Sequence, residues 1–141
     1  MAKFNFRVDI KSMFFDRIKV QRHLDTRSRK VLARFGAYVR QTAKSSIRRR
    51  KGTSMPGNPP FSHVGTLKRH IYFAYDAKAR SVVIGPVIFP GKSGNALPAL
   101  EYGGKSVRND GLRINIQARP FMGPAFTREL TGLSNIWAEI H

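Results

Sequence analysis

The chain has 141 residues, no cysteine and a formal net charge of +18. A single domain suits this length, and the lack of cysteine excludes a disulfide framework and a thiolate metal site. Residues 1–51 hold 16 of the 26 lysines and arginines but only 3 of the 8 acids, and so strong a positive field favours a polyanionic partner such as DNA, RNA or an acidic protein surface.

Residues 1–25 are predicted to form an N-terminal strand followed by an extension. The strand is predicted from the alternation of polar residues with four apolar ones, the period-2 pattern of a half-buried strand: Phe4, Phe6, Val8 and Ile10. Residues 11–20 mix apolar and charged side chains, which suits a short helix or an irregular turn.

A long amphipathic helix is predicted to begin at Asp25 or Thr26, because short side-chain oxygens cap the free amides of a first turn. It is expected to end near residues 49–52. Apolar residues at steps of three and four give it one continuous stripe: Leu32, Phe35, Val39, Ala43 and Ile47. Gly36 lies inside the helix, where glycine costs about 1 kcal/mol relative to alanine, and is expected to mark the close approach of another backbone.

The middle of the chain is predicted to be rich in loops. Residues 51–66 contain three prolines and three glycines, which excludes a regular element. Aromatic and branched residues then predict a β-hairpin of strands 67–75 and 81–87. A second loop over 88–99, a short ordered piece over 99–102 and a polar loop over 105–111 complete this part.

Alternating Leu112, Ile114 and Ile116 predict a further strand, and Pro124 suits the first turn of a last helix. The apolar stripe of that helix is Phe126, Leu130, Leu133, Trp137 and Ile140. Two amphipathic helices need an apolar sheet face to cover. We therefore predict a single α+β domain over residues 1–141, with a small, mostly antiparallel sheet, a long N-terminal helix, a C-terminal helix and long Gly/Pro-rich loops. Residues 26–141 are expected to form its core.

Residue spacing points to no catalytic, cofactor-binding or metal site. The four histidines have no histidine or carboxylate at metal-ligand spacing, and the acids are scattered. No Gly-x-Ser-x-Gly elbow is present, and the Gly91-Lys92-Ser93 triplet lacks the upstream glycine of a phosphate-binding loop and is interpreted as a turn. The protein is therefore not expected to be an enzyme. No run of about 18 apolar residues predicts a membrane-spanning helix, and residues 1–7 lack the apolar run of a signal peptide.

One run of cations is a candidate contact for a polyanion or an acidic partner: Arg48, Arg49, Arg50 and Lys51. Each such cation can neutralise a phosphate and release a counterion. The alternative is a solvated helix end, since the helix dipole favours cations at the C-terminus.

Three blocks carry a family resemblance. They are residues 65–71 (Gly-Thr-Leu-Lys-Arg-His-Ile), 100–104 (Leu-Glu-Tyr-Gly-Gly) and 118–126 (Ala-Arg-Pro-Phe-Met-Gly-Pro-Ala-Phe). All three are interpreted as structural junctions: a loop entering a strand, a strand end turning on glycines, and a proline-anchored loop starting a helix. The residues singled out in them are Gly65, Leu67, Glu101, Tyr102, Gly103, Arg119, Pro120, Phe121 and Pro124.

In this order, over about residues 26–140, the blocks resemble the neck and tail-completion proteins that join head and tail in long-tailed bacteriophages, similar to minor tail protein Z-type proteins. The resemblance implies a virion protein of the tail or neck, assembled in the host cytoplasm and free of cofactors. Its partners would be copies of itself in a closed ring (a hexamer, or alternatively a dodecamer), adjacent head-completion and tail-terminator or tail-tube proteins, and packaged DNA bound non-specifically. The rival interpretation, from charge alone, is a basic nucleic-acid-binding regulatory protein of the cytoplasm.

Overall fold

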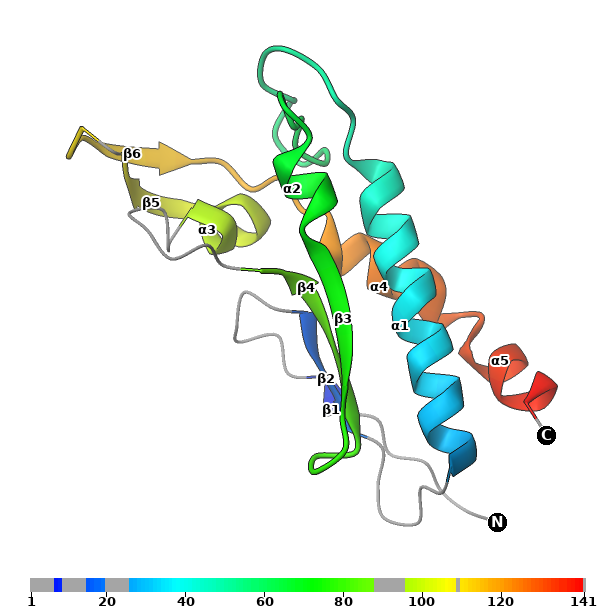
Figure 1. The fold of residues 1–141 in the computed structure, drawn as a ribbon. Helices are drawn as coiled ribbons and strands as arrows, with labels where there is room; N and C mark the ends of the chain where they lie inside the picture. The colour runs from blue at the N-terminus through cyan, green and yellow to red at the C-terminus, as the bar shows by residue number, and fades with distance from the viewer. Residues whose placement is uncertain (1–6, 9–14, 20–25, 88–95, 109, 141) are drawn as a thin grey trace.

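The computed structural model describes residues 7–8, 15–19, 26–87, 96–108 and 110–140, and it confirms an α+β fold (Figure 1). A four-stranded antiparallel sheet has the order β1-β2-β4-β3, and β5 and β6 form a separate two-stranded sheet. The strands are β1 (Arg7–Val8), β2 (Phe15–Lys19), β3 (Ile71–Asp76), β4 (Ser81–Pro86), β5 (Gly104–Val107) and β6 (Arg113–Ile116). The helices are α1 (Thr26–Ser46), α2 (Thr66–Arg69), α3 (Ala96–Tyr102), α4 (Met122–Leu130) and α5 (Leu133–Glu139).

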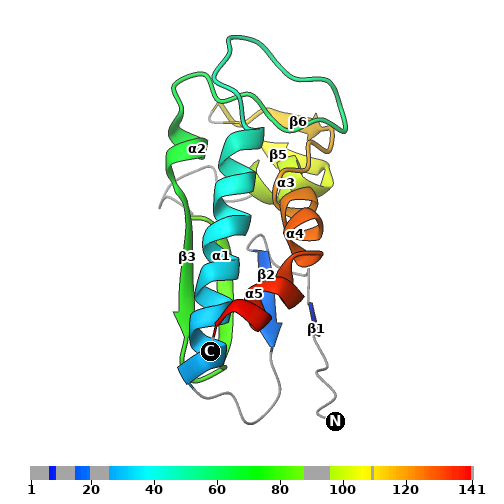
Figure 2. The same cartoon turned by 90° about the vertical axis from the view of Figure 1, so that its right-hand side faces the viewer.

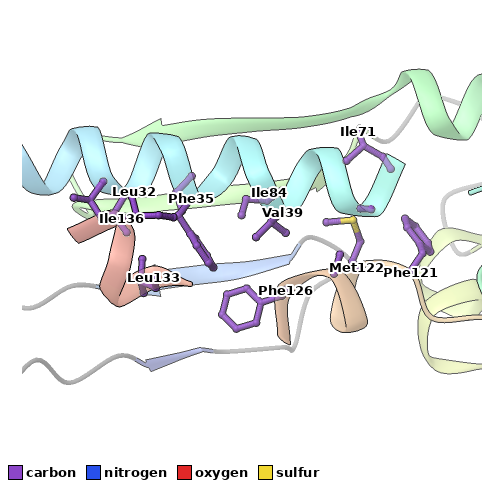
Figure 3. Close-up of a cluster of buried hydrophobic side chains, with 14 of the residues drawn as sticks. Leu32, Phe35, Val39, Ile71, Ile84, Phe121, Met122, Phe126, Leu133 and Ile136 are labelled. Carbon is purple, nitrogen blue, oxygen red and sulfur yellow. The ribbon is translucent and has the colours of Figure 1, made fainter. Parts of the chain in front are cut away.

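Helix α1 lies along the sheet over β3 and β4, and α4 and α5 pack beside it (Figures 1 and 2). The predicted α1 stripe is buried over its whole length, from Leu32 to Ile47. Phe35 meets Phe126 of α4 edge to face, with ring centroids 5.6 Å apart. The core between these layers (Figure 3) is completed by Ile71, Val82, Ile84, Phe121, Met122, Ala125, Leu133 and Ile136.

Gly36 marks a close crossing, as expected, but the neighbours are side chains rather than a backbone. A Cβ at this position would lie 2.8 Å from Cγ2 of Val82 and 3.0 Å from Cδ2 of Phe73. Real Cβ contacts are longer than this, so the missing side chain lets α1 settle onto β3 and β4.

Strand β3 has one open edge. Val87 N donates to His70 O at 3.0 Å, and the antiparallel register pairs Tyr72 with Gly85. Because hydrogen-bonded pairs alternate along such a ladder, the backbone groups of Ile71, Phe73 and Tyr75 point away from β4. An arginine of α1, Arg40, reaches over this edge and donates from Nε to Ile71 O at 2.7 Å.

Three predictions in the first two thirds of the chain are wrong. Helix α1, expected to end near residues 49–52, ends at Ser46. The strand expected from Leu67 begins only at Ile71, because residues 66–69 form α2. The short helix or turn expected over residues 11–20 contains strand β2, whose pairing with β4 shifts register between Phe15 and Ile18. Such an irregularity removes the alternation by which a strand is recognised. The remainder of the predicted N-terminal segment lies outside the described residues, as do Asp25 and positions 88–95.

Two further predictions are wrong in the last third. The polar loop over 105–111 begins with β5, which pairs with β6. The single last helix is two, because a turn at Thr131 and Gly132 separates α4 from α5. That turn leaves Leu130 largely exposed and buries Ile136 in its place. The hairpin partner β4, strand β6 and Pro124 in the first turn of α4 are confirmed.

Candidate functional site

Two of the three sequence blocks meet at one buried carboxylate, that of Glu101. This side chain is only 8% exposed and comes from the C-terminal end of α3. Its two oxygens accept backbone N–H groups from Phe121 (3.0 Å), Met122 (3.2 Å) and Gly123 (2.7 Å). Glu101 therefore supplies from a distant part of the chain the cap that the first turn of α4 lacks locally, and a negative charge suits a helix N-terminus.

Glycines allow this close meeting. Gly103 ends α3 with φ 77°, and its N–H donates to Ala99 O at 2.8 Å, as in other helices that end on a left-handed glycine. A Cβ at Gly103 would lie 3.3 Å from Ala118 N, and one at Gly123 would lie 3.2 Å from Glu101 Oε1. The predicted strand end at Gly103 is thus a helix end, which is a correction.

Arg119 ties the same junction to the proline-rich loop. Its backbone N donates to Leu100 O at 2.6 Å, and its Nε donates to Ser54 O at 2.9 Å. Gly57 N in turn donates to Ala118 O at 2.8 Å. The loop over 51–66 is therefore anchored to the segment before α4. Phe121 is buried, as a plug of the sheet–helix junction should be; Pro120 is half-buried and Tyr102 is exposed.

The block at 65–71 forms a different junction. Gly65 has φ 77° and precedes α2. His70 closes α2, with its backbone N donating to Thr66 O at 3.2 Å and its Nδ1 lying 2.7 Å from the same oxygen. Leu67 packs against the core. The block therefore turns the chain from the loop into β3 through one short helical turn, rather than entering the strand directly.

The candidate basic run lies at the base of the loop over 51–66. All four of its members are exposed: Arg48, Arg49, Arg50 and Lys51. Ser62 N donates to Arg48 O at 3.0 Å, and Arg48 and Phe61 form a parallel bridge. The guanidinium of Arg50 lies over the Phe61 ring, 5.7 Å from its centroid. The backbone is thus held while the charges face solvent.

Three cations elsewhere form a group that the sequence prediction missed: Arg40, Lys44 and Lys68. Arg40 and Lys44 are half-buried on one face of α1, and Lys68 is exposed on α2. Burial lowers the pKa of Lys44, and the neighbouring charges of Arg40 and Lys68 lower it further. The four-residue spacing of Arg40 and Lys44 is a visible signal that they share a helix face, but nothing local brings Lys68 to them.

The β5–β6 ribbon extends from the body on the side of α3 (Figure 1). Near its end Val107 is 51% exposed and Leu112 is 57% exposed. An isolated two-stranded ribbon is marginal in water, and exposed apolar side chains of this size at its tip suit a contact with another protein.

Among the described residues, no group of three or more histidines and acids is placed to hold a metal ion. A pocket of about 260 Å³ between α1 and α4 is lined by hydroxyl and apolar residues and Arg128. Within the described part of the chain, no helix combines the length and apolar character needed to cross a bilayer. Comparison of the sequence with protein-family models and curated proteins, and of the structure with solved structures, finds no match.

Proposed function

We propose that this protein is a structural component of a bacteriophage particle that joins the tail to the head, as a neck or tail-completion ring around the DNA channel. It acts by assembly rather than catalysis. The observation that supports this best is the junction at Glu101, where two of the three blocks of the resemblance are joined by three hydrogen bonds from backbone N–H groups to one carboxylate. The residues of these two blocks therefore have a structural role in the fold, which suits a protein that acts by assembly.

The segments that lie outside the hydrophobic core support a protein that acts by assembly. The β5–β6 ribbon and the loop over 51–66 add little to the buried core, yet both are anchored at the junction before α4. A closed ring forms when one surface of a subunit binds a different surface of the next. We expect the ribbon and the loop to make most of these contacts, in a hexamer or alternatively a dodecamer, and with adjacent head-completion and tail-terminator or tail-tube rings.

The charge supports a position beside DNA. Residues 1–51 carry most of the +18 surplus, and a ring whose inner face is basic can hold packaged DNA without reading its sequence. The protein would then belong to the virion, after assembly in the host cytoplasm.

The second candidate is a cytoplasmic nucleic-acid-binding regulator, which the cluster of Arg40, Lys44 and Lys68 favours. Oligomeric state separates the two candidates. A purified protein that forms a ring and binds DNA weakly supports the virion component, whereas a monomer or dimer that binds DNA tightly supports the regulator.

The test of the proposed function is a phage carrying a nonsense mutation in this gene, grown in a host that does not suppress it. Electron microscopy of the lysate should show DNA-filled or emptied heads and complete tails that are not joined. Expression of the wild-type protein from a plasmid should restore joined particles. Normal tailed particles that lack the protein would contradict the proposal.

A further inference from the structure

A group of like charges is held together on the side of α1 that faces α2 and β3. Arg40 and Lys44 are one helical turn apart, a rise of about 6 Å. Lys68 belongs to α2, which lies beside the C-terminal half of α1 (Figures 1 and 2), and its charge acts on Lys44. Among the described residues, none of the three forms an ion pair with a carboxylate, unlike Arg34 with Glu139 and Arg108 with Asp110.

Bringing these three positive charges together is electrostatically unfavourable in the folded protein. Lys44 is half-buried, and its pKa is lowered by burial first and then by Arg40 and Lys68. Like charges held close without a counter-charge repel one another. A bound anion would relieve both the repulsion and the lost hydration, so the arrangement is complementary to a negative ligand.

The guanidinium of Arg40 is fixed in position by contacts with β3, which would favour binding of such a ligand. Its Nε–H donates to Ile71 O at 2.7 Å, and its Cζ atom lies over the ring of Tyr72, 5.8 Å from the centroid. The four N–H groups on its terminal nitrogens have no partner among the described residues. An arginine fixed in this way loses little side-chain entropy when it binds a phosphate through two parallel hydrogen bonds.

We propose that Arg40, Lys44 and Lys68 form a binding site for the phosphates of double-stranded DNA, independent of base sequence. Two lysines and one arginine are the groups that contact phosphates, whereas protein interfaces are depleted in lysine and depend on a buried apolar centre. Arg48 follows four residues after Lys44, beyond the end of α1 at Ser46, and begins the exposed basic run.

As a statement about packaged DNA, this inference rests on the function proposed above. As a statement about phosphate binding, it can be tested on the purified protein, so the two can fail separately. A variant that no longer binds DNA but forms joined particles would leave the proposed function standing.

The experiment compares two triple variants of equal net charge and one double variant. The site variant carries R40Q, K44Q and K68Q. Its matched control removes three exposed cations of the β3–β4 turn, the ribbon and α4: K78Q, R113Q and R128Q. A second site variant, K44Q/K68Q, keeps the contacts of Arg40 with Ile71 and Tyr72 and therefore its contribution to folding. Fluorescence anisotropy with a short duplex of random sequence gives the Kd at several salt concentrations.

We expect the triple site variant to bind the duplex about tenfold more weakly or worse, and the slope of log K against log salt to lose about 2–3 in magnitude. The double variant should lose about 2 in the same slope, and the control less than about 1. Equal losses in the site variants and the control would overturn the proposal, because the charge would then act only through the overall field.

Polyglutamate of similar length identifies the rival ligand. If the site variants lose affinity for polyglutamate but keep wild-type affinity for DNA, the group serves an acidic protein and the proposal is wrong. If they lose affinity for DNA by the larger factor, the proposal holds.

Discussion

At the scale of single residues, Glu101 is the charged side chain that joins α3 to the start of α4. It is buried, and its carboxylate accepts three backbone N–H groups from a segment about twenty residues further on. A helix start that depends on a distant side chain is specified by the tertiary fold, so residues 121–123 need no local capping residue of their own.

Replacing Glu101 by glutamine tests this dependence. The amide keeps one acceptor but directs a donor at backbone donors, so the loss in unfolding free energy should be roughly 2–4 kcal/mol. Chemical denaturation of the purified variant measures it. Glu139→Gln, at an exposed salt bridge with Arg34, is the control and should change stability by less than about 1 kcal/mol. Equal effects of the two variants would show that the cap contributes little.

Gly36 allows a prediction in which two effects oppose each other. Alanine would gain about 1 kcal/mol of helix propensity, but its Cβ would lie 2.8 Å from Val82 Cγ2, and overpacking costs about 1–3 kcal/mol. We expect a net loss of about 1 kcal/mol from these two terms. Val82→Ala makes room, so the double variant should be more stable than the sum of the single effects predicts. Strict additivity would show that α1 does not press on Val82.

At the scale of elements, α1 is stabilised by its buried stripe rather than by its ends. Phe35 is fully buried and meets Phe126 of α4 edge to face. Phe35→Ala should therefore cost roughly 3–5 kcal/mol of unfolding free energy. Tyr38→Ala, on the exposed side of the same helix, is the control and should cost far less. An unchanged unfolding midpoint for Phe35→Ala would show that this face of α1 is not packed in the core.

The β5–β6 ribbon should matter for assembly and not for stability. Replacing the exposed Val107 and Leu112 by serine should leave thermal unfolding of the subunit nearly unchanged, since little packing is lost. Self-association, measured by light scattering after gel filtration, should weaken. Leu130→Ser, an exposed apolar residue on α4, is the matched control. If both variants assemble like wild type, the ribbon is not the contact surface.

At the scale of the whole molecule, the excess of positively charged side chains serves several structural roles. Arg40 covers the open edge of β3, and Arg50 lies over Phe61 in the loop it anchors. Arginines of this kind block unwanted strand pairing and hold loops. Arg48, Arg49 and Lys51 of the basic run are exposed and are expected to contribute little to stability.

Neutralising Arg48, Arg49 and Arg50 should therefore leave the unfolding midpoint close to that of wild type, because exposed charges contribute little to stability. The yield of tailed, DNA-filled particles should fall. Wild-type yield and infectivity would instead support the alternative interpretation, in which the run is a solvated helix end without a binding role. Comparison with the R40Q, K44Q and K68Q variant then separates the contribution of the run from that of the group formed by Arg40, Lys44 and Lys68.

Patterns with a local cause could be predicted from the sequence, and long-range ones could not. The stripe from Leu32 to Ile47 and strand β6 follow from periodicity alone. Strand β5 was missed because its polar residues are ordered by pairing with β6. The blocks of the resemblance pointed to the right residues, but the capping role of Glu101 depends on a contact across twenty residues that no local pattern contains. Lys68 joins Arg40 and Lys44 for the same reason.

The return of the chain at Gly103 has a consequence for engineering and for evolution. Arg119 N lies 2.6 Å from Leu100 O, and a Cβ at Gly103 would meet Ala118 N at 3.3 Å. The ribbon is therefore an excursion of the chain whose two ends lie close together. Its length and sequence can change without moving the rest of the fold. Bridging Gly103 to Ala118 with one or two glycines should give a shortened protein that still folds, and such a site can accept a foreign hairpin or tag in place of the native one.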